Sequence, residues 1–325
     1  MAFFDGRTHE SLLFTKIQLK MMKIAIIDSG VDIKHVKLRG VNITQYSTRF
    51  TENKLEIVQE APIDKLGHGT ACAGIIHKRV PSAEILSVRI FKEHLAAKEE
   101  EMVNALLFCI EKKVNIINCS IGIEKKPSEA LYNVCRDAYE KNILIVAASA
   151  NTDSETYPAF FPFVFSVASG AMKSSEWGCL TDSNIKYIAK GMLQRVLNIR
   201  GKYNISAGSS LACPHLVAII ANYLIGNNKA KIEDVHQYLQ VNYKKDILPS
   251  RVIRKERKIK ISSDSANFPL DQYPKEWLKW MRKILAINFV IMIEEELDIE
   301  IDEDDIDEDF FNSFDEIISR LEKYL

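Results

Sequence analysis

Residues 23–30 read KIAIIDSG, an apolar and β-branched run (23–27) that ends in a carboxylate and a glycine. Four more runs of this kind follow, separated by longer segments: ILSVRI at 85–90, NIINC at 115–119, ILIVAA at 143–148 and FVFSVA at 163–168. Short apolar runs between longer segments are typical of buried parallel strands. The sequence therefore predicts a parallel sheet in which residues 23–27 form the first strand.

Two of the segments between these runs have helical periodicity. Residues 98–112 and 128–141 place apolar side chains three and four positions apart: Met102, Ala105, Leu106 and Cys109 in the first, and Leu131, Val134, Cys135 and Ala138 in the second. Strand followed by helix, repeated, predicts an α/β fold with a mostly parallel central sheet. In open sheets of this type the reacting groups gather at the carboxyl ends of the strands. Asp28 stands at such an end.

Length, composition and charge set the frame for function. A chain of 325 residues with 47% hydrophobic content can bury one large core and a small second one. The net charge of -1 argues against nucleic acid or a membrane surface as a partner. We find no apolar run near the roughly 18 residues of a membrane span. Charged residues among the first ten positions argue against a secretory signal, so a cytoplasmic protein is expected.

The six cysteines also favour a cytoplasmic protein. They match no CxxC pair or zinc pattern, and each lies among apolar neighbours: Cys72, Cys109, Cys119, Cys135, Cys179 and Cys213. Disulfide frameworks belong mainly to short secreted chains. Free, buried thiols in a reducing cytoplasm are therefore favoured over disulfides.

Three short motifs contain the groups that could do chemistry. They are Asp28-Ser29-Gly30, the octad GHGTACAG at 67–74 around His68, and GSSLACPH at 208–215 around Ser210. Taken singly, each has an ordinary interpretation: a turn cap, a structural histidine and a helix N-cap. The small residues after His68 allow a helix to begin close against the sheet, with the imidazole in its first turn. Ser210 is also predicted to begin a helix, with Pro214 tolerated in the first turn.

Together, the three motifs resemble the Asp, His and Ser blocks of the subtilisin family, in that family's chain order, over about residues 22–241. The resemblance implies a subtilisin-like three-layer fold and a catalytic triad of Asp28, His68 and Ser210. Two further segments resemble the family's substrate cleft, 118–122 and 146–151. They imply Asn151 as the oxyanion-hole residue and the following substrate-binding residues: Ser120, Ile121, Gly122, Ala148, Ser149 and Ala150.

The chain also departs from the family pattern. Ser209 stands in place of the usual Thr, Leu211 in place of Met, and Ala150 in place of the Gly before the oxyanion asparagine. Ala150 leaves the cleavage preference open. The short segment 77–82 lacks the Asn-rich insertion that holds a tight calcium ion in some members, so no metal and no cofactor are expected. The twenty-one residues before Met22 are too short for a folded prodomain, so none is expected there.

These residue types suit nucleophilic catalysis. A serine hydroxyl needs a base to take its proton, a histidine can be that base and later the acid, and an aspartate can orient it. The resemblance implies a serine endopeptidase, and we expect dedicated intracellular processing, such as leader-peptide removal from a ribosomally made peptide. Two alternatives stay open: a general intracellular protein-turnover subtilisin, and an inactive peptide-binding pseudoprotease.

The last third of the chain has a different charge pattern. We divide the sequence into an extension (1–21), a catalytic domain (22–245), a basic segment with a linker (246–274) and an acidic helical domain (275–325). Residues 244–260 are rich in Lys and Arg, whereas 294–316 are acidic and contain neither. Both can be solvated surface. The alternative is that their attraction docks the tail on the catalytic domain.

Residues 276–296 are apolar at helical spacing, and an acidic loop and a last apolar segment follow. This stretch resembles the later half of an acyl carrier protein, with Lys283 at the position of the phosphopantetheine serine. The resemblance implies a small helical module without a prosthetic group that docks a partner. Equally, Trp277, Trp280 and Phe289 can form the core of a helical cap.

Overall fold

The computed structural model describes residues 21–51, 54–60, 64–150, 155–180, 186–192 and 194–244. Near the C-terminus it describes residues 290, 294, 299, 301–302, 305–306 and 314–324. The described residues do not include the extension up to residue 20, Asn151, Lys283 or any of the basic segment and linker (246–274).

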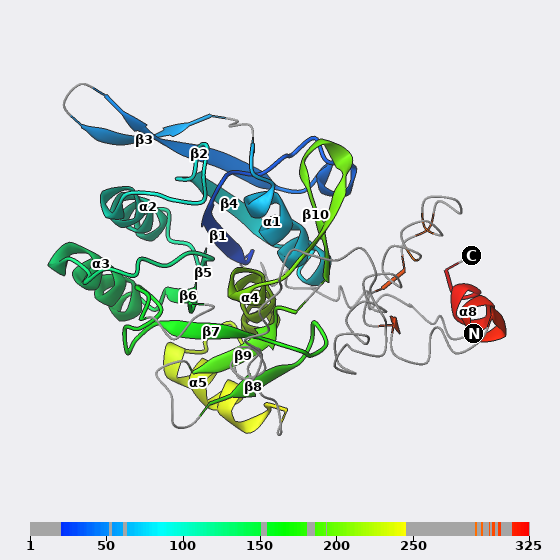
Figure 1. Ribbon diagram of the computed structural model, residues 1–325. Helices are drawn as coiled ribbons and strands as arrows, with labels where there is room; N and C mark the ends of the chain where they lie inside the picture. Colours follow the sequence, from blue (N-terminus) through cyan, green and yellow to red (C-terminus); the bar gives the residue numbers. More distant parts are fainter. Residues whose placement is uncertain are drawn as a thin grey trace, which may run out of the picture.

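The centre of the structure is a nine-stranded sheet (Figure 1) in the order β3-β2-β4-β1-β5-β6-β7-β9-β8. Neighbours from β2 to β9 run parallel, and only the two edge pairs, β2 with β3 and β9 with β8, are antiparallel. The strands are β1 (Lys23–Asp28), β2 (Ile43–Phe50), β3 (Leu55–Gln59), β4 (Glu84–Arg89), β5 (Ile116–Cys119), β6 (Leu144–Ala148), β7 (Phe165–Gly170), β8 (Trp177–Cys179) and β9 (Tyr187–Lys190). This confirms the predicted mostly parallel α/β sheet.

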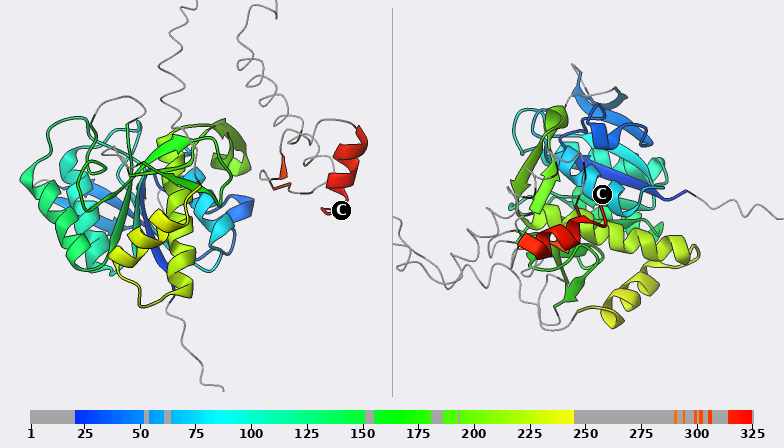
Figure 2. Two further views of the ribbon diagram at one scale, coloured as in Figure 1. Left: turned by 90° about the horizontal axis from the view of Figure 1, so that it is seen from below. Right: turned by 90° about the vertical axis from the view of Figure 1, so that its right-hand side faces the viewer.

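Helices cover both faces of this sheet (Figure 2), because the strand side chains alternate between two cores. In β1, Ile24 and Ile26 pack with α1 (His68–Arg79), α4 (Ser209–Gly226) and α5 (Ile232–Val241). Ala25 and Ile27 of the same strand pack with α2 (Glu99–Glu111) and α3 (Glu129–Glu140) on the other face. The result is the three-layer arrangement that the resemblance implied.

Helix α4 corrects one expectation. By length and composition it could cross a membrane, contrary to the sequence-based statement that no apolar run comes near that length. In the structure it is a core helix: 67% of it is buried, and its apolar side chains pack against those of β5, β6, β7 and β9. Its hydropathy reflects burial on nearly all sides.

A small hairpin and a C-terminal unit lie outside the main sheet. Strands β10 (Gln194–Leu197) and β11 (Tyr203–Ser206) pair antiparallel, and β10 packs on α1. Near the C-terminus, α8 (Phe314–Leu321) contributes Leu321 to a cluster with Val290 and Ile301. The comparison with an acyl carrier protein stays a prediction, because most of residues 275–313 lie outside the described part.

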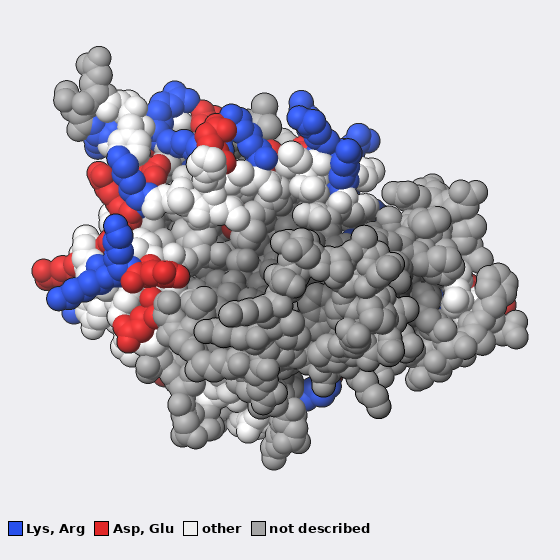
Figure 3. Space-filling model, in the orientation of Figure 1, with Lys and Arg blue, Asp and Glu red and all other residues white. Residues whose placement is uncertain are grey.

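The surface and the cysteines agree with the composition. All six cysteines are free, and five of them are buried. On the face shown in Figure 3, basic and acidic side chains alternate over α2 and α3, where Arg136 pairs with Glu140 and Lys141 pairs with Asp137. Interspersed charges of both signs are consistent with a net charge near zero.

Candidate active site

Asp28 is the last residue of β1, and its carboxylate is almost fully buried. One carboxylate oxygen accepts the Ser29 N–H at 2.8 Å, and the Ser29 hydroxyl oxygen in turn accepts the Gly69 N–H at 2.9 Å. A Cβ atom on Gly69 would lie 2.1 Å from the Gly30 carbonyl oxygen. Glycine at position 69 therefore allows the first turn of α1 to press directly against the turn after β1.

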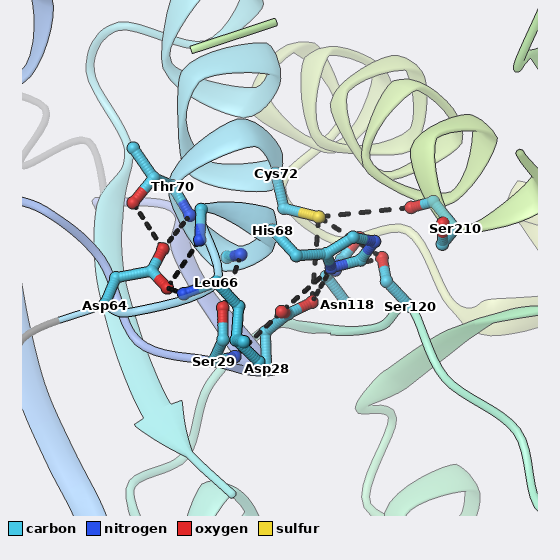
Figure 4. Close-up of polar contacts among 12 residues, drawn as sticks. Asp28, Ser29, Asp64, Leu66, His68, Thr70, Cys72, Asn118, Ser120 and Ser210 are labelled. Carbon is cyan, nitrogen blue, oxygen red and sulfur yellow. Dashed lines mark hydrogen bonds and ion pairs between the residues drawn. The ribbon is translucent and has the colours of Figure 1, made fainter. Parts of the chain in front are cut away.

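His68 is the first residue of α1, as predicted, and its side chain faces Asp28 (Figure 4). Its Nδ1 lies 2.9 Å from both carboxylate oxygens of Asp28. A carboxylate only accepts hydrogen bonds, so Nδ1 donates, and in the neutral imidazole the lone pair is on Nε2. The imidazole is 16% exposed and the carboxylate 1%. This arrangement leaves Nε2 available as a base.

The surroundings of His68 set its pKa. Burial lowers the pKa of the imidazole, but the negative charge and hydrogen bond of Asp28, together with the neighbouring Cys72 side chain, outweigh burial and raise the pKa well above 6.5. The imidazole acts as a base only when it is neutral, so activity should fall as the pH drops through this raised pKa. We therefore expect the acidic limb of kcat/KM against pH, measured with a peptide substrate, to lie above pH 6.5. A limb at or below pH 6.5 would contradict this electrostatic account.

Asp64 holds the start of the helix on which His68 lies. Its Oδ1 accepts the N–H groups of Leu66 (3.0 Å) and Gly67 (2.9 Å). Its Oδ2 accepts the N–H (3.1 Å) and the hydroxyl (2.5 Å) of Thr70. Gly67 itself has a positive φ of 77°, so the chain enters the helix by a left-handed residue. Asp64 thus satisfies donors that a helix N-terminus leaves without acceptors. The motif analysis missed Asp64, although an Asp three residues before Gly67 could have been predicted to cap the start of the helix.

Replacing Asp64 by asparagine should destabilise this helix start. The new NH₂ group would face the Thr70 N–H, and two donors cannot pair. We expect a loss of about 1–3 kcal/mol in the free energy of unfolding, measured by urea titration. Asp137→Asn, on the exposed surface of α3, is the matched control and should cost about 0.5 kcal/mol or less. Equal losses in the two variants would show that Asp64 has no special structural role.

Ser210 is the second residue of α4. Pro214 lies inside the helix as its sixth residue, in the second turn rather than the predicted first. Proline has no N–H, so the Ser210 carbonyl loses the helical hydrogen bond it would otherwise accept from position 214. The Cys72 thiol lies 3.9 Å from this carbonyl oxygen, within reach of a weak S–H···O hydrogen bond. Its one S–H can alternatively donate to Asp28 Oδ2, 3.8 Å away.

Cys72 is the point where the three motifs meet (Figure 4). Its Sγ lies 3.8 Å from Asp28 Oδ2, 3.5 Å from Ser120 Oγ and 3.9 Å from Ser210 O. Cys72 itself is one helical turn after His68. The structure therefore brings Asp28, His68 and Ser210 around one thiol. The sequence showed only that Cys72 lies in an apolar context.

The same thiol belongs to a possible metal-ligand set. Among the described residues, ligand atoms of Asp28, His68 and Cys72 lie within 4.8 Å of one another. Burial raises the pKa of the Cys72 thiol, so at neutral pH it is protonated. A soft metal ion binds the thiolate rather than the thiol. The hydrogen-bonded arrangement of these residues suits proton transfer better than metal binding.

The segments predicted to bind substrate lie beside this cluster. Ser120 follows β5 and is buried, and its hydroxyl oxygen accepts an N–H from the Asn118 side chain at 2.8 Å. Ile121 is half-buried, and Gly122 is exposed. Ala148 ends β6, and the carbonyl oxygen of Ser149 accepts the Ser209 hydroxyl at 2.5 Å. Ser209 therefore ties the start of α4 to this segment.

Thr156 is a neighbour of the site that the motif analysis did not single out. Its hydroxyl oxygen accepts the Ala150 N–H at 3.0 Å. Its side chain also packs against Gly122 so closely that a Cβ atom at position 122 would lie 2.7 Å from the Thr156 Cβ. It thereby connects the two segments predicted to bind substrate. Asn151, the predicted oxyanion residue, lies outside the described residues. Its role stays a prediction.

Comparisons with known proteins identify the family of this chain. "Subtilisin-like protease 2" of Plasmodium falciparum is 28% identical over 247 residues, covering 68% of this chain and 18% of that protein. The "Major intracellular serine protease" of Bacillus subtilis is 27% identical over 246 residues, covering 68% and 75%. The solved structure "Prenylagaramide maturation protease PagA" matches with a TM-score of 0.56 and 21% identity over 69% of this chain and 84% of that chain. The subtilase family model matches residues 20–255. The chain therefore belongs to the subtilase family.

Proposed function

We propose that this chain is a serine endopeptidase that hydrolyses peptide bonds through Asp28, His68 and Ser210. The observation that supports this most strongly is the hydrogen bonding of His68 Nδ1 to both oxygens of the buried Asp28, with Ser210 next to the same thiol as Asp28. On this proposal, His68 Nε2 is the base that accepts the proton of Ser210, which is the second residue of α4. The comparisons show the family; the roles of the residues are our proposal.

The proposed reaction begins with attack of Ser210 Oγ on the carbonyl carbon of the substrate. His68 Nε2 takes the hydroxyl proton, and Asp28 stabilises the imidazolium that forms. The same proton then goes to the departing amine, which leaves an acyl group on Ser210. His68 then takes a proton from water as the water attacks this ester. The bond between the acyl carbon and Ser210 Oγ breaks, the imidazolium returns the proton to Ser210 Oγ, and the carboxylic acid product leaves.

The tetrahedral intermediate carries a negative oxygen that needs donors. Ser210 lies in the first turn of α4, where a helix leaves N–H groups without an acceptor from a preceding turn. The positive end of the helix dipole at this position favours a negative charge. We assign the Ser210 N–H and the Asn151 side chain to the oxyanion hole. Removal of one such donor typically costs about a hundred- to a thousandfold in kcat.

The substrate is proposed to be an extended peptide or protein segment. It would lie between residues 120–122 and 148–150, which Thr156 connects. The Ser149 carbonyl and the Ala150 N–H are engaged within the protein, so Ile121 and Gly122, which are half-buried and exposed, offer the more accessible backbone. Backbone pairing to an extended peptide supplies affinity with little side-chain selectivity.

We further propose that the enzyme processes a few dedicated substrates in the cytoplasm. The C-terminal unit beside the catalytic domain supports a specialised role, and PagA shows that the same fold serves as a maturation protease. The six free cysteines are compatible with a reducing compartment. A docking partner for the C-terminal unit belongs to this proposal, whereas nucleic acid and membranes do not.

Parallel digestion of casein and of a peptide library distinguishes processing from general turnover. A processing enzyme should cut a small fraction of the library at a recurring sequence and leave casein largely intact over the same time. Rapid loss of casein without sequence preference would instead identify a turnover protease. Ser210→Ala protein, treated identically, controls for contaminating proteases.

A further inference from the structure

A basic pocket lies between the second half of α1 and the β10–β11 hairpin. Lys78 and Arg79 of α1, Lys190 of β9 and Arg195 of β10 line it, and so does Asp302 from the C-terminal segment. The sequence around Asp302 is the acidic run 294–316, which contains no Lys or Arg. Opposite charges therefore meet at this pocket. The proposed reaction uses none of these side chains.

The contact between the two parts is anchored by an ion pair between Arg195 and Glu294. Both side chains are buried, with exposed fractions of 7% and 6%. The other carboxylate oxygen of Glu294 accepts the Ile301 N–H at 2.7 Å. The Arg195 guanidinium also lies over the Tyr203 ring, 4.8 Å from its centroid. Charges taken out of water need partners, and here the opposite charge, the Ile301 N–H and the Tyr203 ring supply them.

A second, weaker pair extends the contact. Lys78 Nζ lies 3.7 Å from Asp302 Oδ1, and both side chains are about 40% exposed. Asp302 is held within its own segment, where its N–H donates to the Tyr324 hydroxyl at 3.0 Å. Ile301 packs in the cluster with Val290 and Leu321. The acidic groups are thus presented by a packed unit, on the side of the molecule where β10 lies (Figures 1 and 2).

The hairpin that receives Glu294 also contacts both helices of the candidate active site. Val196, next to Arg195, packs with Ala71 and Ile75 of α1 and with Leu211 of α4. On the other side of Arg195, the Gln194 side-chain oxygen accepts the His215 Nε2–H at 2.8 Å. Position 71 lies three residues after His68, and Leu211 directly follows Ser210. A group bound to Arg195 therefore contacts a hairpin that packs beside the helices carrying His68 and Ser210.

We propose that this basic pocket is the docking site for the acidic C-terminal segment of this same chain, and that docking holds the β10–β11 hairpin against α1 and α4. Glu294 is the anchor, and Asp302 adds a screened, surface contribution. On this proposal, Glu294 and Asp302 are contacts to the catalytic domain rather than solvated surface. The proposal does not depend on the enzymatic activity.

Hydrogen exchange measured by mass spectrometry on the full chain tests this proposal. A Ser210→Ala background excludes self-digestion during the measurement. Glu294→Gln keeps an acceptor for the Ile301 N–H but removes the negative charge that Glu294 supplies to the buried Arg195. We expect exchange in the hairpin (194–206) and at Ile301 to rise about a hundredfold. Arg195→Met removes the other partner of the ion pair and should raise exchange in the same two segments.

Glu322→Gln is the matched control, because Glu322 is an exposed acidic residue of the same C-terminal unit. It should leave exchange in the hairpin unchanged. Hairpin exchange that is equal in Glu294→Gln, Arg195→Met and their parent would overturn the proposal. Faster exchange confined to Ile301 would overturn it too, because the segment would then dock without holding the hairpin. Glu294 lies outside the catalytic domain, so its variant leaves the sequence of that domain intact.

Discussion

Replacement of Ser210 by alanine is expected to lower kcat for peptide hydrolysis by about a millionfold, the loss associated with the serine of the subtilisin triad itself. The reason is that the methyl group offers no nucleophile, while His68 and the helix N-terminus remain in place. The residual rate should stay above that of the uncatalysed reaction, because binding and oxyanion stabilisation persist. Steady-state kinetics with a fluorogenic peptide measures the loss.

Ser209→Ala is the matched control for this experiment. The Ser209 hydroxyl donates to the Ser149 carbonyl at 2.5 Å in a buried position, so its loss removes a structural hydrogen bond. Such a loss costs about 1–3 kcal/mol of stability. It should lower kcat far less than Ser210→Ala does. Equal losses in the two variants would contradict the assignment of Ser210 as the nucleophile.

Asp28→Asn is expected to lower kcat by about ten-thousandfold. His68 Nδ1 now donates to the carboxylate, at 2.9 Å from each oxygen. If the new amide nitrogen faces Nδ1, it donates to that atom and the imidazole proton moves to Nε2. The imidazole can then no longer accept the serine proton. The variant should fold, because asparagine has nearly the same shape as aspartate.

Asp32→Asn serves as the control for this variant. Asp32 lies four residues after Asp28, and its carboxylate accepts the N–H groups of Lys34 (3.1 Å) and Arg200 (2.8 Å), with no contact to His68 in the described structure. Its activity should remain within about tenfold of wild type, since only exposed hydrogen bonds weaken. An Asp28→Asn enzyme as active as Asp32→Asn would show that the histidine does not depend on this carboxylate.

Much of the sheet could be predicted because its inner strands are apolar on both faces. The predicted run 85–90 corresponds to β4 (Glu84–Arg89), and the predicted helix 98–112 to α2 (Glu99–Glu111). The polar edge hairpin of β2 and β3 was not predicted, because its exposed face breaks the apolar run. Strand β8 has three residues, too few for any periodicity to be read.

The site could be predicted as a set of motifs but not as a geometry. The spacing of the motifs identified Asp28, His68 and Ser210, yet Cys72 and the Ser210 carbonyl are 138 positions apart. Only the fold brings them together. The same holds for Thr156, which connects the two substrate segments, and for Glu294, whose partner Arg195 is in a distant hairpin. Contacts between remote segments depend on packing, which local patterns do not encode.

The most direct test of the proposed active site is stoichiometric labelling by a fluorophosphonate, followed by peptide mapping. A serine activated by His68 should form one covalent adduct per chain, on Ser210. The adduct should be absent in Ser210→Ala and form much more slowly in Asp28→Asn. A folded wild-type chain that remains unlabelled, or that is labelled equally after Ser210→Ala, would contradict the account.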